Sequence, residues 1–168
     1  FIVESPIAER FERAFAERMA ALRVGDPLDR STAVGPLARD DLRDVLDRQV
    51  SASVAAGARV LTGGARVPGP GFFYTPTVLA GVIPGMPVFD EETFGPVAAV
   101  TRARDAAEAL ALANRSRFGL GASLWTGDPE RGEALAQDIE AGLVFVNGIV
   151  KSDPRLPFGG IKASGYGR

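Results

Sequence analysis

The sequence predicts an α/β fold with a largely parallel sheet and flanking helices, ending in a glycine-rich loop. From residue 97 to residue 146, short apolar segments alternate with amphipathic ones in the order strand, helix, strand, helix, strand. Strands joined by helices favour parallel pairing with right-handed crossovers. A chain of 168 residues with 46% hydrophobic and 24% charged residues has the size and balance of one globular domain.

Two amphipathic helices are expected in the first third of the chain. The first begins at Ser5-Pro6, as a hydroxyl N-cap followed by proline, and runs to about residue 23, with charged residues such as Glu12 on its polar side. The second spans residues 39–56. Spacings of three and four residues predict one buried stripe on each helix. The stripes contain Ile7, Phe11, Phe15, Met19 and Leu22 in the first helix and Leu42, Val45, Leu46, Gln49, Val50 and Val54 in the second.

Short strands and turns rich in Gly and Pro follow these helices. Residues 86–96 are expected to form a loop without regular structure. Asp128-Pro129 is expected to cap and open the last helix. In order, the predicted elements are strands over residues 58–62, 72–74, 77–79 and 97–101, a helix over 105–116, a strand over 122–126, a helix over 128–140 and a strand over 143–146.

Two residue types are missing from the composition. The chain contains no cysteine and no histidine. It therefore cannot itself form a disulfide, a thiolate nucleophile, a Ser/His/Asp relay or a zinc site of the usual ligands. No metal site is expected, and any catalysis must use carboxylates, lysine, tyrosine or an outside cofactor.

Charge and hydropathy narrow the possible partners. The net charge is −2 and there is no basic block, so nucleic acid is not an expected partner. No apolar run approaches the roughly 18 residues of a membrane helix. A soluble, cytoplasmic protein is expected.

The sequence starts at Phe1-Ile2-Val3, without methionine. This start favours a chain cut from a longer one inside a strand. The alternative is a processed or tagged chain.

The GxGxxG fingerprint of dinucleotide-binding folds is absent from the sequence. The first candidate binding feature is instead an acidic triplet. Asp90, Glu91 and Glu92 are followed directly by Phe94 and a Gly-Pro pair. A carboxylate beside an aromatic ring suits a sugar or ribose, since the carboxylate accepts two hydroxyl hydrogen bonds and the ring covers a flat partner. The alternative is a solvated acidic loop with Phe94 in the core.

The last 20 residues form a second candidate feature. Their glycines and prolines make regular structure improbable, yet they carry Phe158 and Tyr166. Loops that carry large aromatic side chains often bind a ligand. The alternative is a tail tucked over the core or against a partner subunit.

Three linked segments resemble the aldehyde dehydrogenase superfamily. They are Glu91-Glu92-Thr93-Phe94-Gly95-Pro96-Val97, Val146-Asn147-Gly148 and the segment Pro157-Phe158-Gly159-Gly160-Ile161-Lys162-Ala163-Ser164-Gly165-Tyr166-Gly167-Arg168. The resemblance covers essentially residues 1–168 and implies the C-terminal part of the catalytic domain, beginning just after the segment with the catalytic cysteine. Residues 151–158 most resemble bacterial succinate-semialdehyde dehydrogenases.

The resemblance implies roles for four residues, and the chemistry of a fifth, Arg155, adds one more candidate. Glu92 would hold the nicotinamide-ribose hydroxyls of NAD or NADP, and Phe94 would pack beside the nicotinamide. Phe158 would line the aldehyde tunnel, and Ser152 would help to hold a distal carboxylate of the substrate. Arg155 lies close enough in sequence to add a bidentate clamp, the alternative being an ion pair at the surface or between domains.

The same resemblance implies that the nucleophilic cysteine and the Rossmann half lie upstream. The intact enzyme, expected to be a homo-oligomer, would oxidise an aldehyde to an acid, and this chain alone would be inactive. One alternative is a short non-catalytic chain that serves as a binding or assembly module. A carboxylate hydrolase using the acidic triplet would not explain the final segment.

Overall fold

The computed structural model describes residues 1–167, so Arg168, the last residue of the final motif, lies outside the described residues. The chain divides into two compact units, unit 1 (Phe1–Asp105) and unit 2 (from Ala106 onward).

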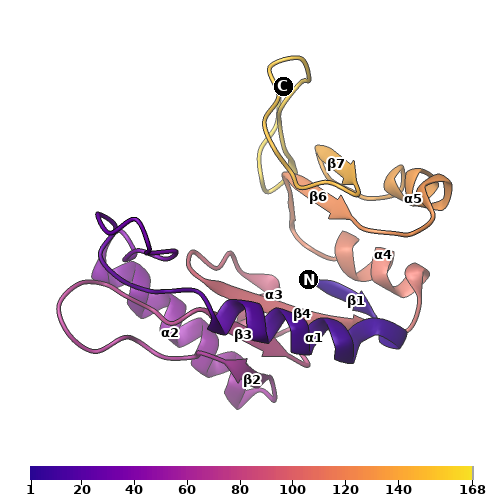
Figure 1. Ribbon diagram of the computed structural model, residues 1–168. Coiled ribbons are helices and arrows are strands. Elements are labelled where there is room, and N and C mark those ends of the chain that lie inside the picture. The colour runs from indigo at the N-terminus through magenta and orange to yellow at the C-terminus, as the bar shows by residue number, and fades with distance from the viewer. Residues whose placement is uncertain (168) are drawn as a thin grey trace. The chain divides into compact units, whose positions relative to one another are not determined.

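Unit 1 is built on a four-stranded mixed sheet in the order β1-β4-β3-β2 (Figure 1). The inner strand β4 pairs in parallel with both of its neighbours, β1 and β3. The edge strand β2 pairs antiparallel with β3. The first residues form a strand at the edge of this sheet. The strands are β1 (Ile2–Glu4), β2 (Arg59–Thr62), β3 (Thr77–Ala80) and β4 (Val97–Ala103).

Helices cover both faces of this sheet: α1 (Ser5–Ala20) on one and α2 (Asp40–Ala55) with α3 (Pro87–Asp90) on the other. Side chains of a strand alternate between faces. Val78 accordingly packs with Ala8 of α1, whereas Leu79 packs with Leu46 of α2. All four residues of β3 are buried, as expected of a strand covered on both sides.

The first helix differs from its prediction. It ends at Ala20 rather than near residue 23, and Ser5 does not cap it, because the Ser5 hydroxyl donates to the Ala103 carbonyl at 2.9 Å. Ile7 is half exposed, whereas Glu12, predicted on the polar side, is buried. Glu12 can be buried because Arg102 donates to its two carboxylate oxygens, each at 2.8 Å.

Two further predictions in unit 1 are wrong. The loop expected over residues 86–96 contains α3, because Pro87 lies at its start and needs no amide partner there. The strand expected over residues 72–74 is reduced to one isolated bridge between Tyr74 and Arg66.

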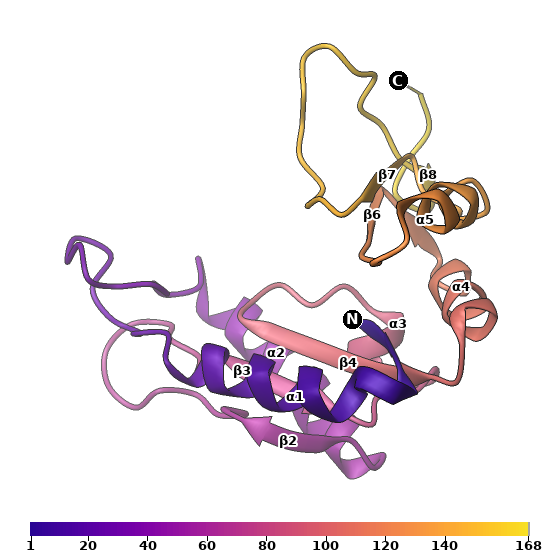
Figure 2. The ribbon, with the colours of Figure 1, turned by 45° about the vertical axis from the view of Figure 1, so that its right-hand side comes forward.

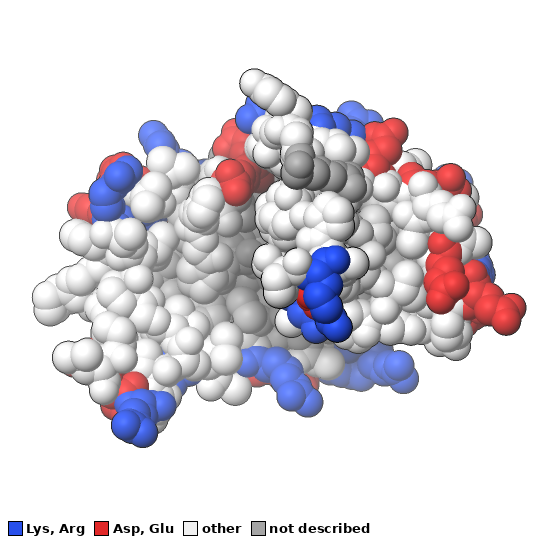
Figure 3. All heavy atoms as spheres, turned by 90° about the horizontal axis from the view of Figure 1, so that it is seen from above, with Lys and Arg blue, Asp and Glu red and all other residues white. Residues whose placement is uncertain are grey.

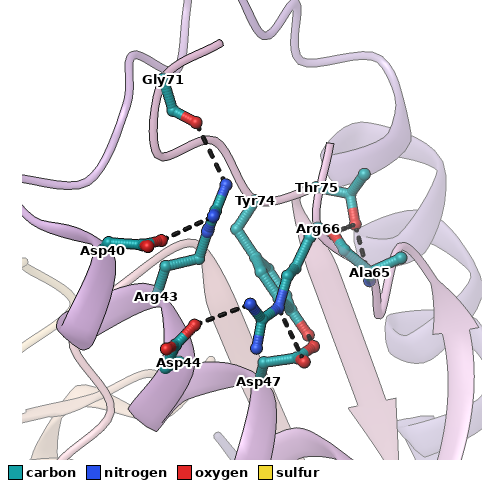
Figure 4. A network of polar contacts seen from close by, with 9 residues as sticks. All are labelled: Asp40, Arg43, Asp44, Asp47, Ala65, Arg66, Gly71, Tyr74 and Thr75. Carbon is teal, nitrogen blue, oxygen red and sulfur yellow. Dashed lines mark hydrogen bonds and ion pairs between the residues drawn. The ribbon is translucent and has the colours of Figure 1, made fainter. Parts of the chain in front are cut away.

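A polar network fixes α2 against the 65–75 segment (Figure 4). The Tyr74 side chain is fully buried, and its hydroxyl donates to Asp47 Oδ1 at 3.1 Å. Arg66 pairs with Asp47 at 2.9 Å and with Asp44 at 2.7 Å, while Arg43 donates to the Gly71 carbonyl at 3.1 Å. Burial, followed by the negative charge of Asp47, raises the pKa of Tyr74 well above its ordinary value.

This raised pKa predicts a loss of stability at high pH. Above pH 10 an unfolded chain releases the Tyr74 proton while the folded chain keeps it, so the free energy of unfolding falls as pH rises. By pH 11 the loss should reach about 1 kcal/mol. Urea unfolding at pH 9 and pH 11 measures it, with Tyr74→Phe as the control that lacks the titrating group. Equal pH slopes for both proteins would contradict the prediction.

Unit 2 contains two small sheets (Figure 2). β6 and β7 pair in parallel, β5 and β8 pair antiparallel, and α5 packs against β7. Asp128 caps α5 as predicted, because its carboxylate accepts from the Arg131 amide at 3.1 Å. The elements are α4 (Ala106–Asn114), β5 (Phe118–Gly119), β6 (Gly121–Leu124), α5 (Pro129–Ala136), β7 (Leu143–Val146) and β8 (Ile161–Lys162).

The predicted α/β class with flanking helices is confirmed, and three of the five strand pairings among the described residues are parallel. The strands form separate sheets, however, and not the one layer expected. β4 pairs with β1 and β3, whereas β6 and β7 pair only with each other among the described strands. The predicted alternation of strands and helices is confirmed, but alternation alone does not specify which strands pair with each other. The final segment also contains β8, where only irregular structure was expected.

Within residues 1–167, no helix is both long and apolar enough to cross a membrane. On the face seen in Figure 3, lysine and arginine side chains lie in separate groups with carboxylates among them.

Candidate functional site

The acidic loop, residues 91–96, carries two of the predicted site residues. It connects α3 to β4, and both Glu92 and Phe94 are exposed. Phe94 exposes 64% of its surface, so the alternative that placed this ring in the core is wrong for unit 1. Among the described residues the Glu92 carboxylate has no hydrogen-bond partner. Both of its oxygens can therefore accept hydroxyl groups from a ligand.

The backbone of the acidic loop is fixed at its end by the sheet. The Thr77 amide donates to the Pro96 carbonyl at 2.8 Å. Gly95 has a φ of 155° and packs against the core, where an added Cβ would lie 2.4 Å from Leu46 Cδ2. Glycine is required here for both its conformation and its lack of a side chain. The exposed side chains of Glu92 and Phe94 thus extend from a loop whose end is fixed.

The side chain of Gln49, in α2, forms hydrogen bonds with the same loop. The sequence analysis did not predict this contact. Its side-chain nitrogen donates to Glu91 Oε2 at 2.8 Å and to the Glu92 carbonyl at 3.1 Å. The sequence did contain a signal, because Gln49 is the one polar member of the apolar stripe predicted for its helix. A polar residue on a buried face needs a partner.

The tail loop, residues 148–158, carries the other three predicted residues and starts at a well-fixed point. Asn147 follows β7 with a φ of 53°, a conformation that asparagine tolerates better than most residues. Its amide donates to the Leu124 carbonyl at 2.8 Å, and its Oδ1 accepts from the Thr126 amide at 2.9 Å. Asn147 thereby joins the ends of β6 and β7.

Within the tail loop, Ser152 and Phe158 are exposed, and the Ser152 hydroxyl has no partner among the described residues. Arg155 instead forms a local ion pair, with Nη2 2.7 Å from Asp153 Oδ2. The hydrogen bonds from the Arg155 side chain and backbone lower the pKa of Asp153 to about 2. The ion-pair alternative thus describes this Arg155 conformation, and its role as a substrate clamp stays a prediction.

The end of the tail loop is fastened to unit 2 by the glycine-rich motif. Lys162 Nζ donates to the carbonyls of Asn114 and Ser116, at 2.7 and 3.0 Å, and pairs with Glu140 at 2.6 Å. Ser164 Oγ accepts from the Gly119 amide at 3.0 Å. The lysine and serine of this motif therefore have structural roles here.

The structure groups the five predicted residues on two loops. Glu92 and Phe94 share the acidic loop of unit 1, whereas Ser152, Arg155 and Phe158 share the tail loop of unit 2. A shallow hollow in unit 1, lined by residues that include Val24, Pro27, Pro68 and Phe73, contains none of them. Within residues 1–167, no three acidic side chains gather in a way that could hold a metal ion.

Comparisons with known proteins identify relatives of the whole chain. The model of the aldehyde dehydrogenase family matches residues 1–168. The chain is 52% identical to the succinate semialdehyde dehydrogenase (NAD(P)+) Sad of Escherichia coli (strain K12), and 49% identical to the succinate-semialdehyde dehydrogenase (NADP(+)) of Mycobacterium avium (strain 104). Each match covers 100% of this chain and 36% of the relative.

Comparison with solved structures also finds a similar fold in a protein with a related name. The crystal structure of succinic semialdehyde dehydrogenase from Streptococcus pyogenes, in complex with NADP+, matches with a TM-score of 0.95 and 36% identity, over 100% of this chain and 37% of that chain. The chain thus spans little more than a third of the relatives it matches. On the full-length family match and these identities, the chain belongs to the aldehyde dehydrogenase family.

Proposed function

We propose that this chain is the C-terminal part of the catalytic domain of an NAD(P)-dependent aldehyde dehydrogenase. The intact enzyme would oxidise succinate semialdehyde, or a related small acid aldehyde, to the carboxylic acid. The names of the relatives support this substrate and cofactor class. The observation that carries the proposal is the exposed carboxylate of Glu92, which has no hydrogen-bond partner within residues 1–167, together with the exposed ring of Phe94 on the same loop.

The chemistry of these two side chains fits a nicotinamide nucleotide. Glu92 would hold the nicotinamide ribose, because its two oxygens can accept both ribose hydroxyls. Phe94 would cover one face of the nicotinamide, a flat ring that suits an aromatic neighbour. When bound, the cofactor supplies a hydride acceptor. These residues would orient it and exclude water from one side.

The tail loop would supply substrate recognition. Ser152 has a hydroxyl that bonds no other described residue and can donate to a carboxylate, and Phe158 offers apolar surface to an aldehyde chain. The 168 residues contain no cysteine, so the thiol that attacks the aldehyde would come from elsewhere in the intact protein. The resemblance also supports a cytoplasmic homo-oligomer.

Glu92→Gln in the intact enzyme tests the cofactor contact. An amide has one acceptor oxygen instead of two and no charge. The free energy of cofactor binding should therefore weaken, and the barrier to hydride transfer rise, by about 1–3 kcal/mol each, which lowers the affinity and the rate roughly 5- to 150-fold. Cofactor titration and single-turnover kinetics measure both quantities. Glu133→Gln, the same change at an exposed position of α5, serves as the control. Unchanged cofactor affinity in Glu92→Gln would refute the proposed contact.

Ser152→Ala tests substrate recognition. Losing a hydrogen bond to a charged group should lower kcat/KM for succinate semialdehyde by roughly 10- to 150-fold, mainly through KM, while butanal is nearly unaffected. Phe158→Ala should impair both aldehydes, because apolar packing does not distinguish a charged end from a neutral one. Equal losses for both substrates in Ser152→Ala would remove the support for an acid aldehyde.

A further inference from the structure

Gln49 is a buried amide whose donor groups all point to one loop. Only 6% of its surface is exposed, and its side chain reaches from α2 to the acidic loop. Both partners of its nitrogen, the Glu91 carboxylate and the Glu92 carbonyl, are acceptors. The amide must therefore face them with its nitrogen, which fixes the orientation of the side chain chemically.

Packing alone does not account for this residue. Burying an amide is costly unless its polar atoms find partners, and an apolar side chain of similar size would fill the same volume without that cost. Gln49 Oε1 is buried with no hydrogen-bond partner in the described part of the chain. The position thus tolerates an unsatisfied acceptor while both observed bonds are directed to Glu91 and Glu92.

The bond to the Glu92 carbonyl matters because the Glu92 side chain forms no hydrogen bond or ion pair with any residue that the structure describes. The direction of its carboxylate is set by the backbone from which it extends. That backbone is fixed after Glu92 by Gly95 against Leu46 and by the Thr77–Pro96 hydrogen bond, and before it by the Glu91 amide, which donates to the Pro87 carbonyl at 2.9 Å. Gln49 alone bonds the Glu92 carbonyl among the described residues, so its removal frees the peptide group next to the Glu92 side chain.

We propose that Gln49 is a positioning residue for nicotinamide-nucleotide binding, acting through Glu92. It does not touch the ligand; it holds the Glu91-Glu92 backbone so that the Glu92 carboxylate is already directed toward the ribose hydroxyls. Pre-organisation of this kind raises affinity because the loop does not have to be ordered on binding. The inference rests on the proposed function of Glu92.

The test is a double-mutant cycle in the full-length enzyme, read as the cofactor Kd by calorimetry with whichever of NAD+ and NADP+ binds more tightly. Gln49→Met keeps the volume and removes both donors. It should weaken binding by about 3- to 30-fold in the wild-type background and by less than twofold when Glu92 is already glutamine. Ser53→Ala is the matched control, because it removes a buried hydroxyl of α2 that donates to the Gln49 backbone carbonyl and accepts from the Val88 amide of α3, and it leaves the Gln49 side chain and its two bonds to the acidic loop in place.

Glu91→Ala provides a second route if Gln49→Met does not fold. Glu91 is exposed, so its truncation is tolerated by the core, yet it removes one of the two acceptors that hold the Gln49 amide. It should weaken cofactor binding in the same direction. An unchanged Kd in these variants, or equal losses with and without Glu92, overturns the inference alone. An unchanged Kd in Glu92→Gln overturns the proposed function instead.

Discussion

Gly142→Ala in the full-length protein is expected to lower the free energy of unfolding by about 3 kcal/mol or more and to loosen the tail loop. An added Cβ would lie 1.8 Å from the Gly159 carbonyl oxygen and 2.8 Å from its carbon. Both are backbone atoms, which cannot rotate away as the end of a side chain can. The expected loss is at or above the upper end for overpacking. Because Gly159 follows Phe158 directly, kcat/KM for aldehydes should fall as well.

Urea unfolding and steady-state kinetics measure these two effects of Gly142→Ala. Gly127→Ala is the control, because its Cβ would meet no atom within 4 Å and its backbone does not adopt a positive φ. That variant should differ from the parent by less than about 1 kcal/mol. A Gly142→Ala protein as stable as the Gly127→Ala protein would disprove the close packing of residue 142 against the 159–160 backbone.

Gly95→Ala is expected to have the second large effect, on stability and on cofactor binding together. Its Cβ would lie 2.4 Å from Leu46 Cδ2, and Leu46 is 1% exposed and so has little room to move. The φ of 155° adds backbone strain for any residue with a side chain. The two costs together should reach about 3 kcal/mol. The displaced acidic loop should weaken cofactor binding, since Glu92 extends from it.

A matched pair of variants separates the two costs at Gly95. Gly57→Ala has a comparable positive φ of 110° with nothing within 4 Å of its Cβ, so it reports strain without a clash. Combining Gly95→Ala with Leu46→Ala creates room for the added methyl group. The double variant should therefore lose less stability than the sum of its two single changes. Strict additivity would show that Leu46 does not limit this position.

The periodicity of the sequence located most helices and strands of the fold. The strand over residues 143–146 and the cap at Asp128 are confirmed, because both depend on local patterns. Strand partners could not be predicted in the same way, since pairing depends on contacts between distant residues. Glu12 shows the same limit, because nothing near it in the sequence indicates the Arg102 side chain that permits its burial.

The structure gives the exposure of the predicted site residues but does not test their roles. Glu92 and Phe94 lie exposed on one loop, which is compatible with ligand binding, and their binding roles stay predictions. Gln49 could not be assigned a role, because its partners lie more than 40 positions along the chain. For Arg155 the sequence leaves open a substrate clamp or an ion pair with an unnamed partner, because a charged side chain can reach several neighbours. The structure shows the pair with Asp153.

The tail loop is anchored at both ends by contacts that do not involve its own residues 148–158. Asn147 holds one end to β6, while Lys162 and Ser164 hold the other. The entropic cost of closing a loop grows slowly, by about 0.6 kcal/mol for each doubling of its length. Insertions, deletions and substitutions between the anchors can therefore accumulate while unit 2 still folds. If the tail loop recognises the substrate as proposed, substitutions within it can change the substrate preference during evolution at little cost to the stability of the fold.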